Sequence, residues 1–196
     1  ELEPLAESDI EYPKSEPYQL CTFSRVMKEK GIEDAINAVE SVNAHFGRTV
    51  YTLDIFGQVD VEYKERFSQL EKSFPDYISY GGAIEANKSV ETLKSYFALL
   101  FPTYYKVEGF AGTLIDAMSA GVPVIASDWK YNPEFVVSGK TGVIIKNCNA
   151  ERLAEELINI AAAPEKWNSM RLSALKESEK YKPDIAARPL IDRING

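Results

Sequence analysis

Residues 98–127 read ALLFPTYYKVEGFAGTLIDAMSAGVPVIAS. The first four, Ala98–Phe101, are apolar throughout and predict a buried strand. A loop with two glycines follows, then a helical run over Thr113–Ala120, and then a β-rich run over Val122–Ala126. Strand, helix and strand in this order build a parallel sheet, because parallel strands need a crossover connection. This stretch therefore predicts an α/β fold.

The same alternation of strands and helices extends on both sides of this stretch. Further strand-like runs cover Tyr18–Ser24, Val50–Phe56, Tyr77–Tyr80 and Thr141–Ile145. Apolar residues recur at helical spacing over 32–46, 63–74, 89–96 and 150–162, with Asn149 placed to cap the last helix. Six strands separated by helices predict a doubly wound, Rossmann-like parallel sheet. Such sheets bind ligands beyond the carboxyl ends of their strands, so functional residues are expected in the loops there.

Two segments flank this predicted domain. Residues 1–17 contain five glutamates, an aspartate and three prolines without an apolar period, which is typical of a linker or surface arm. We therefore expect one ligand-binding domain over residues 18–180 and a C-terminal tail over residues 181–196.

The composition argues against several classes of function. The chain has 22 Lys+Arg and 30 Asp+Glu, and the resulting charge of 22 − 30 = −8 disfavours nucleic acid as a partner. Two cysteines, Cys21 and Cys148, and one histidine, His45, disfavour a disulfide framework, a zinc site and a Ser-His catalytic system. The longest apolar stretch, Tyr96–Tyr105, is about half of what spans a bilayer. We expect no membrane span, no metal and no cofactor, in a cytoplasmic protein whose full-length form could attach peripherally to a membrane.

The loop after Phe101 is the most informative one, since it leads directly into a helix. Backbone N–H groups of Gly112, Thr113 and Leu114, together with the positive end of the helix dipole, are expected to bind a phosphate without a metal. The alternative is that the glycines only turn the chain, while Thr113 and Asp116 form a capping box. The cap and the anion site are compatible.

Three motifs together carry a resemblance to a known family. The run from Glu108 to Ser127 has an acid, seven residues, a second acid at Asp116 and then Ala-Met-Ser-Ala-Gly-Val-Pro-Val-Ile. It resembles the retaining glycosyltransferases of family 4, specifically their C-terminal donor-binding domain, which is one half of the GT-B fold. Ser24-Arg25 followed by Lys30-Gly31, and the run from Pro133 to Gly142, are also similar to the family. The second acid of the family is usually Glu, so Asp116 is a departure.

The resemblance implies a nucleotide-diphosphate sugar as the ligand and assigns a role to each matched residue. Arg25 and Lys30 would neutralise the diphosphate and stabilise the leaving group. Glu108 would bind hydroxyls of the donor sugar, and Asp116 would face the ribose from the same cleft. Because Asp is one methylene shorter than Glu, the ribose would sit closer, a water would bridge, or the contact would be weak. The remaining substrate-binding residues are expected to be Gly82, Ala83 and Ile84 at the base, and Gly109, Phe110, Ala111, Gly112, Thr113 and Leu114 at the phosphates and sugar.

Less specific explanations exist for the same residues. A glutamate before a glycine is commonly a surface acid, an aspartate near a helix start commonly serves the helix dipole, and Arg25 and Lys30 could be solvated cations. The surrounding pattern favours the functional interpretation.

The function implied by the resemblance is transfer of a sugar, of the hexosyl type, to a hydroxyl acceptor with retention, as in polysaccharide biosynthesis. A missing N-terminal domain would bind the acceptor, so this chain alone is expected to be inactive. Leu190 and Ile194 in the tail would then lie unburied, next to that domain. Alternatives are another GT-B enzyme, such as a nucleotide-sugar epimerase or a phosphorylase, or a non-catalytic, nucleotide-sensing flavodoxin-like module. An NAD-binding domain fits poorly, because no Gly-x-Gly-x-x-Gly follows the first strand.

Overall fold

The computed structural model describes residues 3–186 and residue 193. Most of the predicted C-terminal tail, including Leu190 and Ile194, lies outside the described residues. None of the helices within the described part of the chain is long and apolar enough to cross a membrane.

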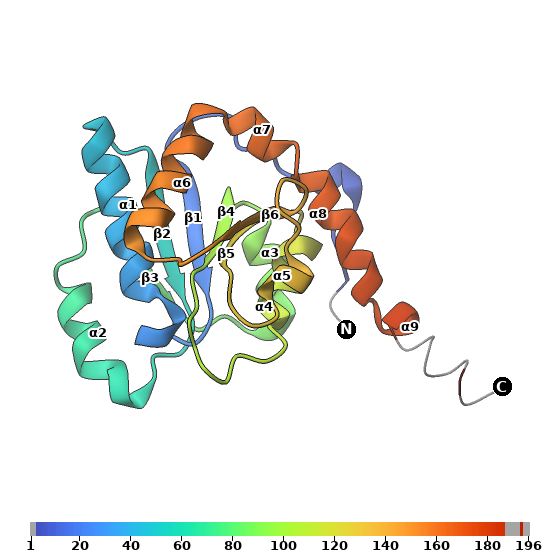
Figure 1. Cartoon of the computed structure of the whole chain (residues 1–196), viewed down its shortest axis with the longest axis horizontal. Helices are drawn as coiled ribbons and strands as arrows, with labels where there is room; N and C mark the ends of the chain where they lie inside the picture. The colour runs from blue at the N-terminus through green and yellow to red at the C-terminus, as the bar shows by residue number, and fades with distance from the viewer. Residues whose placement is uncertain (1–2, 187–192, 194–196) are drawn as a thin grey trace.

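A single six-stranded sheet forms the centre of the molecule (Figure 1). Its order is β3-β2-β1-β4-β5-β6, and all neighbouring strands pair in parallel. The strands are β1 (Tyr18–Phe23), β2 (Tyr51–Phe56), β3 (Ile78–Gly82), β4 (Ala98–Phe101), β5 (Val124–Ser127) and β6 (Gly142–Ile145). The prediction of a doubly wound parallel sheet is thereby confirmed. The strand order reverses between β1 and β4, which is the place where such sheets open a crevice for a ligand.

Helices cover both faces of the sheet and create two apolar cores (Figure 1). One face carries α1 (Ile32–Phe46), α2 (Lys64–Glu71) and α6 (Ala150–Ala162). The other carries α3 (Ser89–Leu93), α4 (Gly112–Ser119), α5 (Asn132–Phe135) and α8 (Arg171–Ser178). The chain ends its described part with α7 (Pro164–Asn168), which precedes α8, and α9 (Pro183–Ala186). Short 3-10 turns are η1 (Glu7–Asp9), η2 (Lys28–Lys30), η3 (Val61–Tyr63), η4 (Ala86–Lys88) and η5 (Glu179–Tyr181).

The long helix α6 illustrates how the sequence sets these elements. Asn149 occupies the N-cap and its side chain accepts a hydrogen bond from the backbone N–H of Arg152, as expected. Leu153, Leu157 and Ile160 recur at helical spacing and are buried against α1 and the sheet. The two helices α1 and α6 therefore form a layer held by their apolar faces.

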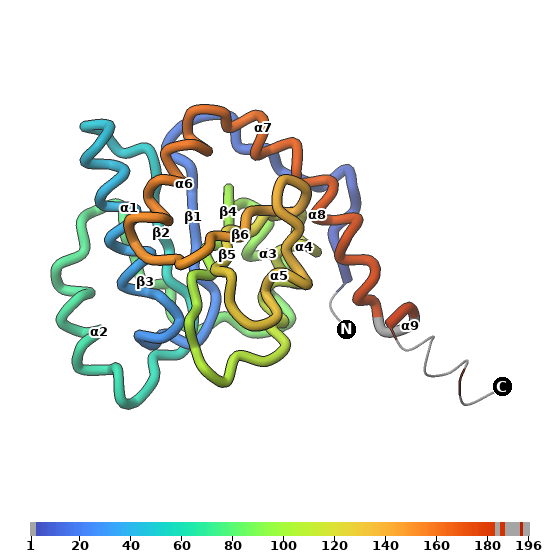
Figure 2. Tube along the Cα trace, in the orientation of Figure 1, coloured from blue at the N-terminus to red at the C-terminus, as the bar shows by residue number. Residues whose placement is uncertain are grey.

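The N-terminal arm packs along the surface of the domain, next to the C-terminal helices (Figure 2). The backbone N–H of Leu5 donates to the carbonyl of Ser119 at 2.9 Å. The side chain of Ile10 is buried, and the Asn168 amide donates to the carbonyl of Pro13 at 2.7 Å. Residues 3–17 thus contribute contacts to the domain although their composition is that of a linker.

Candidate functional site

Two segments meet at the carboxyl ends of β1 and β4. The backbone N–H of Tyr104, in the loop after β4, donates to the carbonyl of Glu29 in η2 at 2.8 Å. Gly31 follows η2 with a φ of +73°, and a Cβ at this position would lie 2.3 Å from the carbonyl oxygen of Pro102. Only glycine allows both this backbone conformation and this close approach. The contact brings Lys30 next to the loop that carries Glu108.

Lys30 and Glu108 form a buried ion pair at this junction. Lys30 Nζ lies 2.7 Å from Oε1 and 2.6 Å from Oε2 of Glu108, and the two side chains are only 12% and 8% exposed. The rings of Phe101 and Tyr105 lie 5.5 and 5.3 Å from Nζ, which places the ammonium between aromatic side chains. Sequence reasoning selected both charged residues, but it did not predict that they neutralise each other.

Thr103 belongs to the same network and was missed by the sequence analysis. Its hydroxyl donates to Glu108 Oε2 at 2.7 Å and accepts the backbone N–H of Tyr105 at 3.2 Å. The side chain is fully buried. The available signal was a small polar residue inside the apolar stretch Tyr96–Tyr105, just beyond a strand end.

Arg25 is held much more loosely than Lys30. Its guanidinium lies 3.6 Å from the Asp60 carboxylate, and its side chain is 59% exposed. An exposed pair at this distance contributes little to stability. Arg25 is therefore free to reorient toward an anion.

Arg25, Lys30 and Glu108 line a cavity of about 240 Å³ beyond the carboxyl ends of β1 and β4. The cavity brings together most of the predicted site residues with several that were not predicted. Its lining consists of Ser24, Arg25, Met27, Lys30, Phe101, Tyr105, Glu108, Phe110, Ala111, Gly112 and Thr113. Among residues 3–186 and 193, no group of three or more His, Cys, Asp or Glu side chains is arranged to hold a metal ion.

The start of α4 differs from the prediction in two ways. Ala111 is the N-cap and no side chain caps the helix, so the alternative explanation, a capping box of Thr113 and Asp116, is wrong. The capping box is absent because the helix begins at Gly112, one residue before the expected start, so Thr113 lies inside the first turn. The amides of Gly112 and Leu114 donate to the carbonyls of Phe110 and Ala111, so two of the three amides expected to bind a phosphate already have an acceptor. Within the described part of the chain, the amide of Thr113 has no such acceptor.

Asp116 lies in a different cavity from Glu108. This second cavity, of about 260 Å³, is lined by Pro4, Phe110, Gly112, Ile115, Asp116, Ser119, Ser178, Tyr181 and Lys182. Burial raises the pKa of the Asp116 carboxyl, and the hydroxyl of Ser89 partly opposes that rise. The two cavities share Phe110 and Gly112, so they adjoin. The expectation of one cleft shared by both acids is therefore corrected to two neighbouring cavities, because Asp116 lies one turn into the helix.

The predicted base-binding residues lie at the end of β3 and directly after it, two strands away from β1. The carbonyl of Gly82 accepts the amide of Gly57 at 2.8 Å, which joins the ends of β2 and β3. Ile84 packs against the apolar core beneath α4. Gly82, Ala83 and Ile84 do not line the cavity of Lys30 and Glu108.

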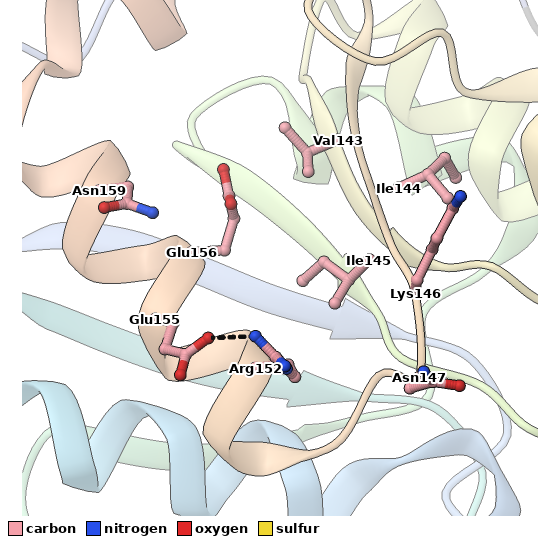
Figure 3. A pocket seen from close by; sticks show the side chains of 9 residues that line it. All are labelled: Val143, Ile144, Ile145, Lys146, Asn147, Arg152, Glu155, Glu156 and Asn159. Atoms are coloured by element: carbon pink, nitrogen blue, oxygen red, sulfur yellow. Dashed lines mark hydrogen bonds and ion pairs between the residues drawn. The ribbon is translucent and has the colours of Figure 1, made fainter.

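A larger cavity of about 380 Å³ lies elsewhere, between the edge strand β6 and helix α6 (Figure 3). Val143, Ile144 and Ile145 come from the strand, and the charged side chains come mainly from the helix. Its ion pair joins Arg152 and Glu155 at 3.0 Å, with side chains 61% and 62% exposed. We call this cavity the β6–α6 groove; it reaches the carboxyl end of β6, where Lys146 and Asn147 line it, but its ion pair is exposed.

Known proteins are similar to this chain in sequence and in fold. The GtfA subunit of the UDP-N-acetylglucosamine–peptide N-acetylglucosaminyltransferase of Streptococcus gordonii is 33% identical over 139 residues, or 69% of this chain. The corresponding subunit of Streptococcus pneumoniae is 28% identical over 163 residues. The chain spans 26% and 31% of these two proteins, so it corresponds to about a third of their length or less.

Solved structures also include chains with a similar fold. A GtfA/B complex superimposes with a TM-score of 0.75 and 26% identity, over 95% of this chain and 37% of that chain. The C-terminal domain of LpcC, a group 1 glycosyl transferase family protein of Francisella tularensis, has a TM-score of 0.71 and 20% identity. The superposition covers 85% of this chain and 87% of that domain.

The family itself follows from a match over most of the chain. Residues 6–177 match the family described as glycosyl transferases group 1, and this range includes part of the N-terminal arm, the whole sheet and most of α8. The chain therefore belongs to the group 1 glycosyl transferases.

Proposed function

We propose that this chain is the C-terminal, donor-binding domain of a retaining glycosyltransferase of family 4. The observation that carries the proposal is the convergence of Arg25, Lys30, Glu108 and the start of α4 on one cavity at the strand-order reversal. Two comparisons support it. The domain of similar size and fold from Francisella tularensis is a C-terminal one, and the Streptococcus gordonii relative is named for UDP-N-acetylglucosamine.

The ligand of this site is a nucleotide-diphosphate sugar, and a UDP-sugar is the first to test. The diphosphate lies at the start of α4, where the helix dipole and the free amide of Thr113 attract an anion. Arg25 reorients from Asp60 toward the phosphates, which is inexpensive because that pair is exposed. Asp116 and the loop over residues 82–84 hold the nucleoside part, with Phe110 and Gly112 between the two cavities.

The reaction is transfer of a hexosyl group to a hydroxyl of an acceptor, with retention of configuration. The bond between the anomeric carbon and the diphosphate oxygen breaks, and the nucleoside diphosphate leaves with increased negative charge. Cations beside the leaving group stabilise that charge in the transition state, which is the role of Arg25 and Lys30. The acceptor oxygen bonds to the anomeric carbon from the same face, and its proton passes to a diphosphate oxygen. A further, N-terminal domain binds the acceptor, so this chain alone binds the donor without transferring its sugar.

Calorimetric titration of the chain with UDP, GDP, ADP and TDP tests the proposal. We expect one of them to bind, and we expect Arg25→Ala to weaken that binding about tenfold, which corresponds to the loss of one charge-assisted contact. Arg152→Ala is the matched control, since it removes an exposed arginine from the larger β6–α6 groove.

Two results decide the assignment. If the folded chain binds none of the four diphosphates at millimolar concentration, it is not a donor-binding domain. If Arg152→Ala weakens binding as much as Arg25→Ala does, the ligand occupies the other groove or binds only by net charge.

A further inference from the structure

We propose that Thr103 is the positioning residue that fixes Glu108 and limits this carboxylate to one hydroxyl of the donor sugar. The inference rests on the proposed function, because it concerns how the same site holds the sugar. It follows from counting the hydrogen bonds of Thr103, Glu108 and Lys30, of which Thr103 is fully buried and the other two are nearly so.

The hydroxyl of Thr103 is committed to Glu108. A hydroxyl has one proton to donate, and its nearest acceptor is Glu108 Oε2 at 2.7 Å, whereas the carbonyl of Glu29 lies at 3.3 Å. Its oxygen accepts the amide of Tyr105 at 3.2 Å. Valine has the same shape without the hydroxyl, so it would remove one of the two donors to Glu108 Oε2 and leave the Tyr105 amide without its acceptor.

The two oxygens of the Glu108 carboxylate therefore accept different numbers of hydrogen bonds. Oε2 receives Lys30 Nζ and the Thr103 hydroxyl, which fills its two acceptor positions. Among the described residues, Oε1 receives only Lys30 Nζ, so one acceptor position is left. Glu108 lines the cavity and can therefore accept one hydroxyl there without giving up Lys30 or Thr103.

Thr103 is itself held from behind by two further buried side chains. The hydroxyl of Ser127, at the end of β5, donates to the carbonyl of Thr103 at 2.5 Å. The amide of Asn132 in α5 donates to the carbonyl of Ser127 at 3.1 Å. Both side chains are buried, so the position of Thr103 is fixed by rigid elements rather than by the loop alone.

The test compares two ligands of the same chain, UDP and UDP-N-acetylglucosamine, by calorimetry. The wild type is expected to bind the sugar nucleotide more tightly than UDP, and Thr103→Val is expected to lose about tenfold of affinity for the sugar nucleotide alone. Thr103→Ser keeps the hydroxyl and should therefore retain the tighter binding of the sugar nucleotide compared with UDP. Thr141→Val is the matched control, because Thr141 is equally buried and its hydroxyl accepts a backbone amide near β6.

Several outcomes overturn the inference. It fails if Thr103→Val keeps the preference for the sugar nucleotide, if UDP affinity falls equally, or if Thr141→Val has the same effect. A wild type that binds UDP without any preference for the sugar nucleotide also overturns it, while leaving the proposed function intact. If Thr103→Val does not fold, Thr103→Ala is titrated in the same way.

A structural measurement decides the question independently of any ligand. A crystal structure of ligand-free Thr103→Val is expected to show the Glu108 carboxylate displaced from its position on Lys30. If the chain binds neither ligand, UDP is not its nucleotide, and this structure still tests the positioning role. A carboxylate in the wild-type position contradicts it.

Discussion

The two cavities that contain ion pairs differ in how their charges are held. In the smaller one, Lys30 and Glu108 are buried, and Thr103 and two aromatic rings fix them in place. In the larger β6–α6 groove, Arg152 and Glu155 are both more than half exposed. Water screens the exposed pair, whereas each buried charge depends on its partner. The difference teaches that the volume of a cavity says less about function than the degree to which its polar groups are fixed.

The largest expected effect comes from breaking the buried pair. Glu108→Leu leaves the ammonium of Lys30 buried without a counter-charge, so the free energy of unfolding should fall by about 3–5 kcal/mol. Urea denaturation followed by circular dichroism measures this. The double variant Lys30→Met/Glu108→Leu should recover most of the loss, because an apolar pair can replace a buried ion pair. Additive losses from the two substitutions would contradict the strong coupling that burial implies.

The second effect separates two glycines of nearly equal φ. Gly31 has a φ of +73° beside Pro102, and Gly139 has a φ of +79° with no atom within 4 Å of an added Cβ. Gly139→Ala should cost only the left-handed strain, about 1–2 kcal/mol. Gly31→Ala adds a clash with the Pro102 carbonyl and should cost about 3 kcal/mol or more. Equal thermal shifts for the two variants would show that the close approach at the site is absent.

A third, smaller effect is a change of stability with pH, and it arises at one acidic residue beside the site and one in the β6–α6 groove. Burial raises the pKa of Asp116 beside the site and the pKa of Glu156 in the groove, while Ser89 and Asn159 respectively oppose the rise. A folded-state pKa above the unfolded one means that the charged carboxylate destabilises the fold at neutral pH. This penalty disappears as the pH falls through the raised folded-state pKa.

Replacing either acid by its amide therefore has a defined sign. Asp116→Asn and Glu156→Gln should each be more stable than the wild type at neutral pH, and the advantage should vanish near pH ~4, where the unfolded-state carboxyls also take up protons. Urea midpoints at several pH values measure the difference. An advantage that grows toward acid pH would reverse the assigned direction of the shift.

The smallest expected effect is at the exposed pair of the groove. Arg152→Ala should change the free energy of unfolding by less than about 0.5 kcal/mol, because the pair with Glu155 is screened by water. Urea unfolding at low and at high salt measures this change. A loss comparable to that of Glu108→Leu would remove the contrast between the two cavities.

Local pattern predicted the secondary structure well where nothing distant intervenes. Ala98–Phe101 and Ala150–Ala162 were predicted to the residue, since an apolar run and an Asn149 cap define them locally. The helix predicted over 89–96 instead ends at Leu93. Arg171 explains this, because its guanidinium binds the carbonyls of Lys94 and Tyr96 from a distant part of the chain. No local pattern contains that contact.

The candidate site shows the same limit. The resemblance to family 4 selected Arg25, Lys30 and Glu108, in loops where the rule that ligands bind beyond strand ends expects functional residues, and the structure brings all three to one cavity. The rule could not predict the Lys30–Glu108 pair or the role of Thr103, because both depend on side-chain geometry across the β1–β4 junction. The resemblance also placed Asp116 in the same cleft, whereas the position of that residue along α4 turns it into the neighbouring cavity.

The two tryptophans of the chain occupy unlike positions and supply separate optical signals. The indole of Trp129 is partly buried and donates to the carbonyl of Tyr105 at 2.7 Å, in the same loop as Glu108. The indole of Trp167 is buried and donates to the carbonyl of Phe97 at 2.9 Å, in the core. Intrinsic fluorescence can therefore distinguish loop rearrangement, seen by Trp129, from global melting, seen by both. A Trp167→Phe chain would carry a single tryptophan, Trp129, bonded to the loop after β4.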